Sequence, residues 1–167
     1  MSMQANNGTL TQAEADAAAE NMIGLWKSGG TLAQAMGLTA DACEAMYAHG
    51  HSLYAQGKYN DAFKIFAQLV AYDHMDSRYQ MALASAMQMT RRYEEALQQY
   101  MIVTVMRIDD PVPVYHCAEC LIALGRPDDA RESLNLVIGT LCKPGEHDVV
   151  RTRAEALLKA LQAKTSA

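Results

Sequence analysis

The chain has 167 residues, of which 50% are hydrophobic, and its formal net charge is −5. This length and apolar content are enough for one domain with a sizeable buried core. The Lys and Arg residues are scattered along the sequence instead of forming a basic patch, so the composition argues against a nucleic acid as partner.

The chain shows no signal for export or membrane insertion. Its first residues, MSMQANNGTL, lack a charged region followed by an apolar one, and no apolar run approaches the roughly 20 residues needed to cross a bilayer. We therefore expect a cytoplasmic protein that does not insert into membranes. In that compartment the four cysteines are expected to be reduced and packed in the interior: Cys43, Cys117, Cys120 and Cys142.

Helix signals divide the chain into four expected parts. A polar tail (1–10) precedes an N-terminal helical region (11–38), in which Thr11 opens one helix that ends near Lys27 and Thr31 opens a short second one. The third part (39–144) consists of paired helices. The last part (145–167) holds a C-terminal capping helix and tail, set apart by Pro144 and Gly145.

From residue 39 onward, helices alternate with short turns and no strand is predicted. The expected helices cover 39–56, 59–72, 76–89, 93–106, 111–124, 127–140 and 146–163. Pro111 and Pro127 fall in first turns, where the missing backbone N–H costs nothing.

A motif returns at a fixed interval. GKYNDAF at Gly57, RRYEEAL at Arg91 and GRPDDAR at Gly125 place their central alanines at positions 62, 96 and 130, a spacing of 34 residues. Helical pairs with this period are typical of tetratricopeptide repeats. Small residues also recur at Gly50, Ala84 and Ala118, where close helix crossings are needed. We therefore predict an all-α fold, a right-handed superhelix of three tetratricopeptide hairpins with N-terminal helices and a C-terminal capping helix.

The first helix of each repeat carries a row of side chains that we expect on the concave surface of the stack. These rows are Tyr47, His51 and Tyr54; Met81, Ser85 and Gln88; and Tyr115, Glu119 and Ile122. Aromatic rings, flexible Met side chains and a few polar groups favour a groove for an extended, largely apolar peptide. The alternative is that flanking helices bury these residues.

Two short stretches invite a chemical interpretation. His116, Cys117 and Cys120 suggest a redox or zinc site, but no second ligand pair and no βαβ setting accompany them, so packing within a helix is favoured. Asp73 and Asp76 flank His74, and helix capping and turn formation explain them better than acid/base chemistry. The sequence contains no phosphate loop and no nucleophile motif. We predict neither an enzyme nor a cofactor or metal site.

Some tetratricopeptide domains grip a C-terminal carboxylate with a clamp of Lys, Arg and Asn. Here the corresponding positions hold Tyr47, His51, Ala82, Val112 and His116. An acidic tail is therefore not the expected ligand.

The sequence from about Leu25 to Leu161 resembles the class II chaperones of bacterial type III secretion, the LcrH/SycD-like family. The similarity is carried by LWKSGGTL from Leu25, SLYAQGKYNDAFKIFAQLVAYDHMDSRY from Ser52 and DDPVPVYHCAECLIALG from Asp109. The most specific parts are GKYNDAFKIF, YDHMDSRY and AECL. His51 stands where an aromatic residue is usual.

The resemblance implies a function in virulence-associated protein transport. In that family, three repeats cradle a segment of a secreted, pore-forming translocator protein and keep it soluble for export. By matching position, the implied client-binding residues are Tyr47, Tyr54, Tyr72, His74, Arg78, Met81, Ser85 and Tyr115. The family's N-terminal region takes part in self-association.

The apolar end of the first helix fits either of two roles. Met22, Ile23, Leu25 and Trp26 are predicted to form a homodimer interface in the absence of client, although capping of the first repeat explains them equally well. For the whole protein, the main alternative is an adaptor whose repeats bridge stable partners. A thiol-dependent regulator using Cys117 and Cys120 is the third.

Overall fold

The computed structural model describes residues 11–165, so the predicted tail lies outside the described residues. Within this range the chain forms helices and turns and contains no strand. The helices are α1 (Gln12–Lys27), α2 (Leu32–Ala35), α3 (Ala40–Ala55), α4 (Tyr59–Tyr72), α5 (Ser77–Met89), α6 (Tyr93–Met106), α7 (Pro111–Ala123), α8 (Pro127–Leu136), the π-helix η1 (Val137–Leu141) and α9 (Asp148–Thr165). The all-α prediction is confirmed.

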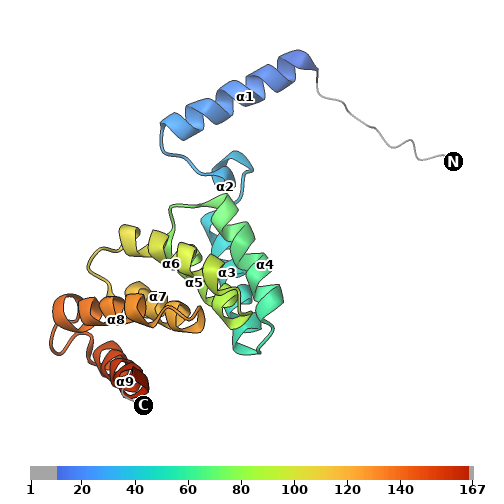
Figure 1. The fold of residues 1–167 in the computed structure, drawn as a ribbon. Helices are drawn as coiled ribbons and strands as arrows, with labels where there is room; N and C mark the ends of the chain where they lie inside the picture. The colour runs from blue at the N-terminus through green and yellow to red at the C-terminus, as the bar shows by residue number, and fades with distance from the viewer. Residues whose placement is uncertain (1–10, 166–167) are drawn as a thin grey trace.

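Three helical hairpins, α3–α4, α5–α6 and α7–α8, stack in chain order, and each helix from α3 to α8 packs on the next one (Figure 1). In Figure 1 α1 lies at one end of the molecule, beyond α2, and α9 lies at the other end. This arrangement is the predicted series of tetratricopeptide hairpins. No helix of the described part of the chain combines the length and apolarity required to span a membrane.

Small residues sit where the helices of a hairpin cross. Ala62, Ala96 and Ala130 have no exposed surface, and Ala84 and Ala118 are equally buried. At Gly50 the crossing is tighter, because a Cβ atom there would lie 2.5 Å from Cε1 of Phe66. The sequence places Gly at this position because α3 and α4 approach more closely than a methyl group allows.

The turn inside each hairpin uses a left-handed residue. Gly57 and Gly125 have φ values of 76° and 73°, and Arg91 occupies the equivalent position of the second repeat with φ 63°. Glycine adopts this conformation without steric cost, whereas arginine does not. The second hairpin therefore carries local strain that its neighbours avoid.

Polar side chains cap α2, α3 and α5, whereas α4, α6 and α8 have no side-chain cap. The Thr31 hydroxyl accepts a hydrogen bond from the backbone N–H of Gln34, and the Thr39 hydroxyl accepts one from Ala42. Asp76 caps α5 by accepting from the backbone of Arg78. Asp73 accepts from the backbone N–H of Met75, so the turn interpretation of these two carboxylates is confirmed.

The predicted boundaries of α3 to α7 and α9 agree with the structure to within two residues, but the helix expected over 127–140 differs. It changes from α to π geometry at Val137 and ends at Leu141, and the N–H of the next residue, Cys142, donates to the Val137 carbonyl at 2.9 Å. Hydrogen bonds between residues five positions apart widen the helix, and the sequence pattern did not predict this change.

The core has two clusters. One joins the first two repeats around Phe66, Leu69 and Tyr100, and the other joins the third repeat to η1 and α9 around Leu134 and Val137. All four cysteines are buried and free. Burial raises the pKa of Cys117 to about 11 and that of Cys120 to about 12, so both remain protonated thiols at neutral pH.

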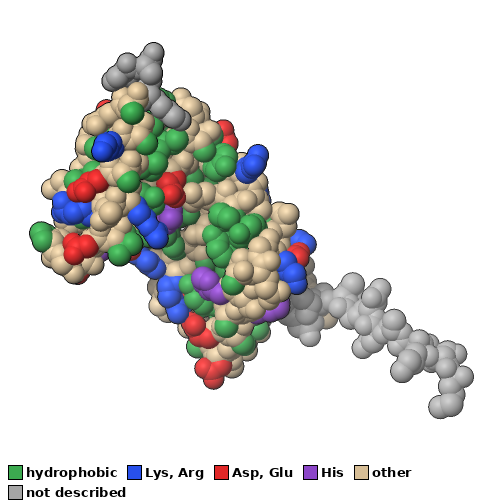
Figure 2. Space-filling view, turned by 90° about the horizontal axis from the view of Figure 1, so that it is seen from below, with side chains coloured by type: hydrophobic (Ala, Val, Ile, Leu, Met, Phe, Trp, Pro, Cys, Tyr) green, Lys and Arg blue, Asp and Glu red, His purple; other side chains and the backbone are tan. Residues whose placement is uncertain are grey.

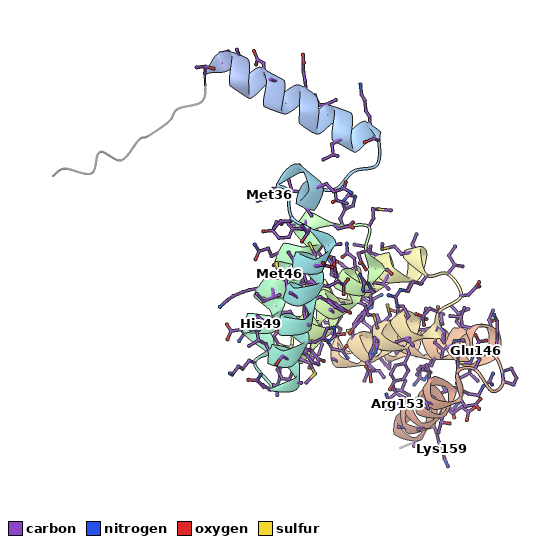
Figure 3. All side chains as sticks on the ribbon, turned by 180° about the vertical axis from the view of Figure 1, so that it is seen from behind. Met36, Met46, His49, Glu146, Arg153 and Lys159 are labelled. Atoms are coloured by element: carbon purple, nitrogen blue, oxygen red, sulfur yellow. The ribbon has the colours of Figure 1, made fainter. Side chains whose placement is uncertain are left out.

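The first repeat has an outer face that the other two repeats lack. Leu83 and Cys117 stand one and two repeats after His49 and are buried, because α5 packs on α4 and α7 packs on α6. No hairpin precedes α3 within residues 11–39, and His49 is exposed at the edge of the molecule (Figure 3). A polar side chain at this position fits a repeat that begins the stack.

Candidate binding groove

A hollow of about 220 Å³ lies between α3 and α5. Six of the predicted binding residues line it together with Phe66, Ala82 and Arg107, and these six are Tyr47, His51, Tyr54, Arg78, Met81 and Ser85. The 34-residue period therefore placed the side chains of two different repeats on one surface. We call this hollow the aromatic pocket.

Aromatic rings in contact with one another form the α3 side of the aromatic pocket. The Tyr47 ring meets His51 edge to face at 4.4 Å between centroids and lies 6.1 Å from Phe66. His51 also contacts the edge of Phe66 at 5.3 Å. Rings that support each other lose little freedom when a ligand arrives, so this side of the pocket is largely organised before binding.

Arg78 holds one end of the aromatic pocket. Its guanidinium pairs with Asp76 at 2.6 Å and with Glu44 at 2.7 Å, and its Cζ lies 5.5 Å from the centre of the Tyr47 ring. Burial alone would raise the pKa of Asp76, but the hydrogen bonds from the Arg78 side chain and backbone lower it. The carboxylates of Asp76 and Glu44 thus both face the positive charge of Arg78.

A chain of hydrogen bonds leads from the aromatic pocket to the third repeat. The Tyr100 hydroxyl lies 3.2 Å from Oγ of Ser85 and donates to Oε1 of Gln88 at 2.7 Å. Nε2 of Gln88 donates to Oε2 of Glu119 at 2.9 Å, and Nδ1 of His116 lies 2.8 Å from the same oxygen. We call Gln88, His116 and Glu119 the polar end of the groove. None of these three lines the aromatic pocket itself.

Tyr115 lies elsewhere than predicted. It was expected on the groove surface, but it is only 8% exposed and belongs to the core cluster that contains Ala154 and Leu161 of α9. The repeat register predicted the direction of the Tyr115 side chain. It did not predict that α9 packs on α7 and belongs to the same core cluster. Burial, followed by a hydrogen bond with Glu119, raises the pKa of Tyr115 to about 12. The alternative of burial by flanking helices applies to this residue.

Tyr72 and His74 also do not line the aromatic pocket. Tyr72 ends α4 and accepts a hydrogen bond from Gln68 at 2.6 Å. His74 lies in the following turn, beside Gly29 and Gly30, and its carbonyl accepts a hydrogen bond from Gln80. Both residues came from the resemblance alone, and the structure places them at the junction with the N-terminal region.

Phe66 and Arg107 line the pocket but were not predicted as binding residues. Phe66 is a wholly buried core residue whose ring also lines the hollow. Arg107 follows α6 and donates to the Ser77 hydroxyl at 2.8 Å. No motif or period marked Arg107, because its place depends on how the second hairpin ends.

A second, larger hollow of about 550 Å³ is formed by α6, α7 and α8. Its lining includes the exposed side chains of Met101, Val105 and Leu136, and none of the predicted binding residues belongs to it. Figure 2 shows one face of the molecule, on which hydrophobic side chains lie among His, Lys and Arg, with no broad area of a single charge. In the described part of the chain, no cluster of three or more His, Cys, Asp or Glu is arranged to hold a metal ion.

Fold and groove define a class: a tetratricopeptide-repeat protein whose aromatic groove suits an extended peptide. Residues 43–76 match the family model of the tetratricopeptide repeat. Low calcium response locus protein H of Yersinia pestis is 33% identical over 138 residues, which cover 83% of this chain and 82% of that protein.

Two solved complexes are similar in sequence and fold. PcrH in complex with the chaperone binding region of PopD is 37% identical, with a TM-score of 0.71, over 77% of this chain and 97% of PcrH. The translocator chaperone SycD of Yersinia enterocolitica, in complex with a peptide of the translocator YopD, is 32% identical, with a TM-score of 0.70, over 76% of this chain and 97% of SycD. The chain belongs to this family of type III secretion translocator chaperones.

Proposed function

We propose that this chain binds an extended apolar segment of a type III secretion translocator in the groove between α3 and α5. Binding takes place in the cytoplasm and keeps the translocator soluble until export. The observation that carries the proposal is the convergence of six predicted residues from two repeats on the aromatic pocket. The relatives PcrH and SycD, which have the same fold, are each bound to a translocator segment.

The chemistry of the proposed role is binding without a catalytic step. A translocator segment that seeks the membrane would aggregate in water, and covering its apolar side chains removes that tendency. Tyr47, Tyr54 and Met81 offer apolar contact area, while backbone groups of an extended peptide supply hydrogen bonds. The secretion machinery can then remove the client by pulling, since no covalent bond holds it.

Matched methionine variants test this proposal. The probe is a fluorescently labelled peptide of the PopD chaperone binding region, titrated with the full-length protein and followed by anisotropy. Met81→Glu places a charge in the aromatic pocket, and Met101→Glu places the same charge in the hollow formed by α6, α7 and α8. We expect Met81→Glu to weaken binding by at least about tenfold and Met101→Glu to leave it unchanged. The reverse result would place the binding surface at α6–α8.

We also propose that the protein forms a homodimer through α1 when no client is bound. Ile23 is 49% exposed near the end of α1, and Leu25 is half-buried against Gly30. The side chains of Met22 and Trp26, predicted for the same interface, lie outside what the structure describes. Light scattering on the full-length Ile23→Glu variant should give the monomer mass, with Ala17→Glu, an exposed position on the opposite face of α1, as the control. A dimer mass for Ile23→Glu would contradict this role.

A further inference from the structure

The two ends of the groove differ in how their charges are compensated. Arg78, at the end formed by α3 and α5, pairs with the carboxylates of Asp76 and Glu44. Glu119, on α7, has as described partners the Gln88 amide, the His116 imidazole and the Tyr115 hydroxyl. None of these partners is a permanent cation. Arg153 of α9 acts electrostatically on the neighbouring Tyr115, but no Lys or Arg of the described residues forms an ion pair with Glu119.

Glu119 is both ionised and accessible. Burial alone would raise its pKa, but hydrogen bonds from His116 and Gln88 lower it, so the side chain is a carboxylate at neutral pH. Its side chain keeps 31% of its surface exposed. A half-buried carboxylate that is already desolvated gains more from a cationic partner than a fully solvated one does.

The position of Glu119 continues the line of the aromatic pocket. Ser85 lines the pocket, and the hydrogen bonds through Tyr100 and Gln88 link it to Glu119. Tyr54, another lining residue, has its pKa raised by burial first, and by the charges of Tyr59 and Glu119 in addition. A peptide leaving the aromatic pocket towards the third repeat would meet Glu119 next.

We propose that Glu119 is a specificity-determining residue that selects client segments carrying a Lys or Arg close to the apolar side chain held in the aromatic pocket. The inference rests on the proposed function and adds a second requirement to it. From Met81 to Gln88 α5 rises by about 10 Å, the length of roughly three residues of extended chain. The basic residue is therefore expected about three positions from the apolar anchor.

The hydrogen-bond network explains why this carboxylate can act as a fixed recognition group. Gln88 and His116 hold Oε2 of Glu119 from α5 and from the preceding turn of α7. His116 is itself stacked on Tyr100, with the ring planes 15° apart and the centroids at 5.1 Å. A carboxylate held by donors from two helices loses little entropy on binding, so its charge discriminates between clients by position.

A double-mutant cycle between client and protein tests this inference. The clients are peptides from the translocator segment that the wild-type protein binds, with each Lys or Arg changed to Met one at a time. The protein variant is Glu119→Gln, which keeps the shape and an acceptor for Gln88. We expect one basic residue of the peptide to contact Glu119. Changing this residue to Met should weaken binding about five- to tenfold, and Glu119→Gln should weaken binding of the unchanged peptide by the same factor. Both changes together should weaken binding no more than either change alone.

Reversal of the charges provides the second arm. Glu119→Lys should reject the wild-type peptide and regain affinity for a peptide in which the critical Lys or Arg is replaced by Glu. If the wild-type protein binds the peptides but no basic position couples to Glu119, this inference is wrong and the proposed function stands. If no translocator segment binds the wild-type protein, the proposed function itself fails.

Discussion

Tyr47 and Tyr115 occupy the same position of the first and third repeats but have different environments. Tyr47 is half-buried and lines the aromatic pocket, with an Arg78 cation beside its ring. Tyr115 is 8% exposed and packs in one cluster with α8 and α9. Met81, midway between them in the register, lines the pocket as Tyr47 does. A repeat position thus fixes the direction of a side chain, and the neighbouring element decides whether it is a surface or a core residue.

The ends of the stack explain this difference. α7 is followed by α8 and then by α9, which contacts α7, whereas the inner faces of α3 and α5 line the aromatic pocket. The open part of the groove is therefore aromatic and lies in the first two repeats. In the third repeat, the groove presents polar groups. Glu119 is partly exposed there, whereas the Tyr115 ring is buried.

The largest expected effect is the loss of stability in Tyr115→Ala. Removing a large buried ring creates a cavity in the cluster shared with α9, which typically costs about 3–5 kcal/mol. For a domain of this size the melting temperature should fall by about 10 °C. Thermal denaturation followed by circular dichroism measures the change. If Tyr115→Ala melts like the wild type but loses the PopD probe, Tyr115 is a groove residue after all.

Gly50→Ala should have the next largest effect, because it acts on the crossing that shapes the aromatic pocket. The new methyl group would lie 2.5 Å from the Phe66 ring, which is wholly buried. We expect a net destabilisation of about 2 kcal/mol, since overpacking outweighs the better helix propensity of alanine. Gly139→Ala, where nothing lies within 4 Å, is the control and should be close to neutral. Urea denaturation of both variants compares them directly, and equal midpoints would mean that the crossing is not tight.

Tyr47→Ala should weaken client binding, whereas Tyr115→Ala should mainly lower stability. The Tyr47 ring is partly exposed, so its removal should lower the melting temperature less than Tyr115→Ala does. An aromatic anchor in a pocket contributes strongly to peptide affinity, and we expect affinity for the PopD probe to fall at least about tenfold, or about 1.4 kcal/mol. Anisotropy titration gives the affinity per folded molecule. Unchanged affinity would exclude Tyr47 from the binding surface.

The smallest expected effect is a gain of stability in Arg91→Gly. Arg91 has φ 63°, whereas its equivalents in the other two repeats are Gly57 and Gly125. Glycine should relieve about 1 kcal/mol of backbone strain and raise the melting temperature by about 2–4 °C. Gly57→Ala should produce the opposite shift. A lower melting temperature for Arg91→Gly would show that the arginine side chain contributes more than its backbone costs.

Sequence reasoning predicted what depends on local pattern and period. Helix boundaries followed from caps such as Thr31 and Asp76, and the 34-residue spacing brought Tyr47 and Met81 to one pocket. It could not predict the burial of Tyr115, because α9 lies outside the repeat and its packing has no counterpart in the first two hairpins. Arg107 and the hydrogen bonds from Tyr100 to Glu119 depend on contacts between side chains from different helices, which no period encodes.

Site-specific photocrosslinking in cells that carry a type III secretion system tests directly whether a translocator occupies the aromatic pocket. Benzoylphenylalanine is placed at position 51, an exposed lining residue of the aromatic pocket, and separately at position 101, in the hollow formed by α6, α7 and α8. If the client occupies the aromatic pocket, position 51 crosslinks to a translocator protein and position 101 does not. Crosslinking of the translocator from position 101 alone would contradict this placement of the client.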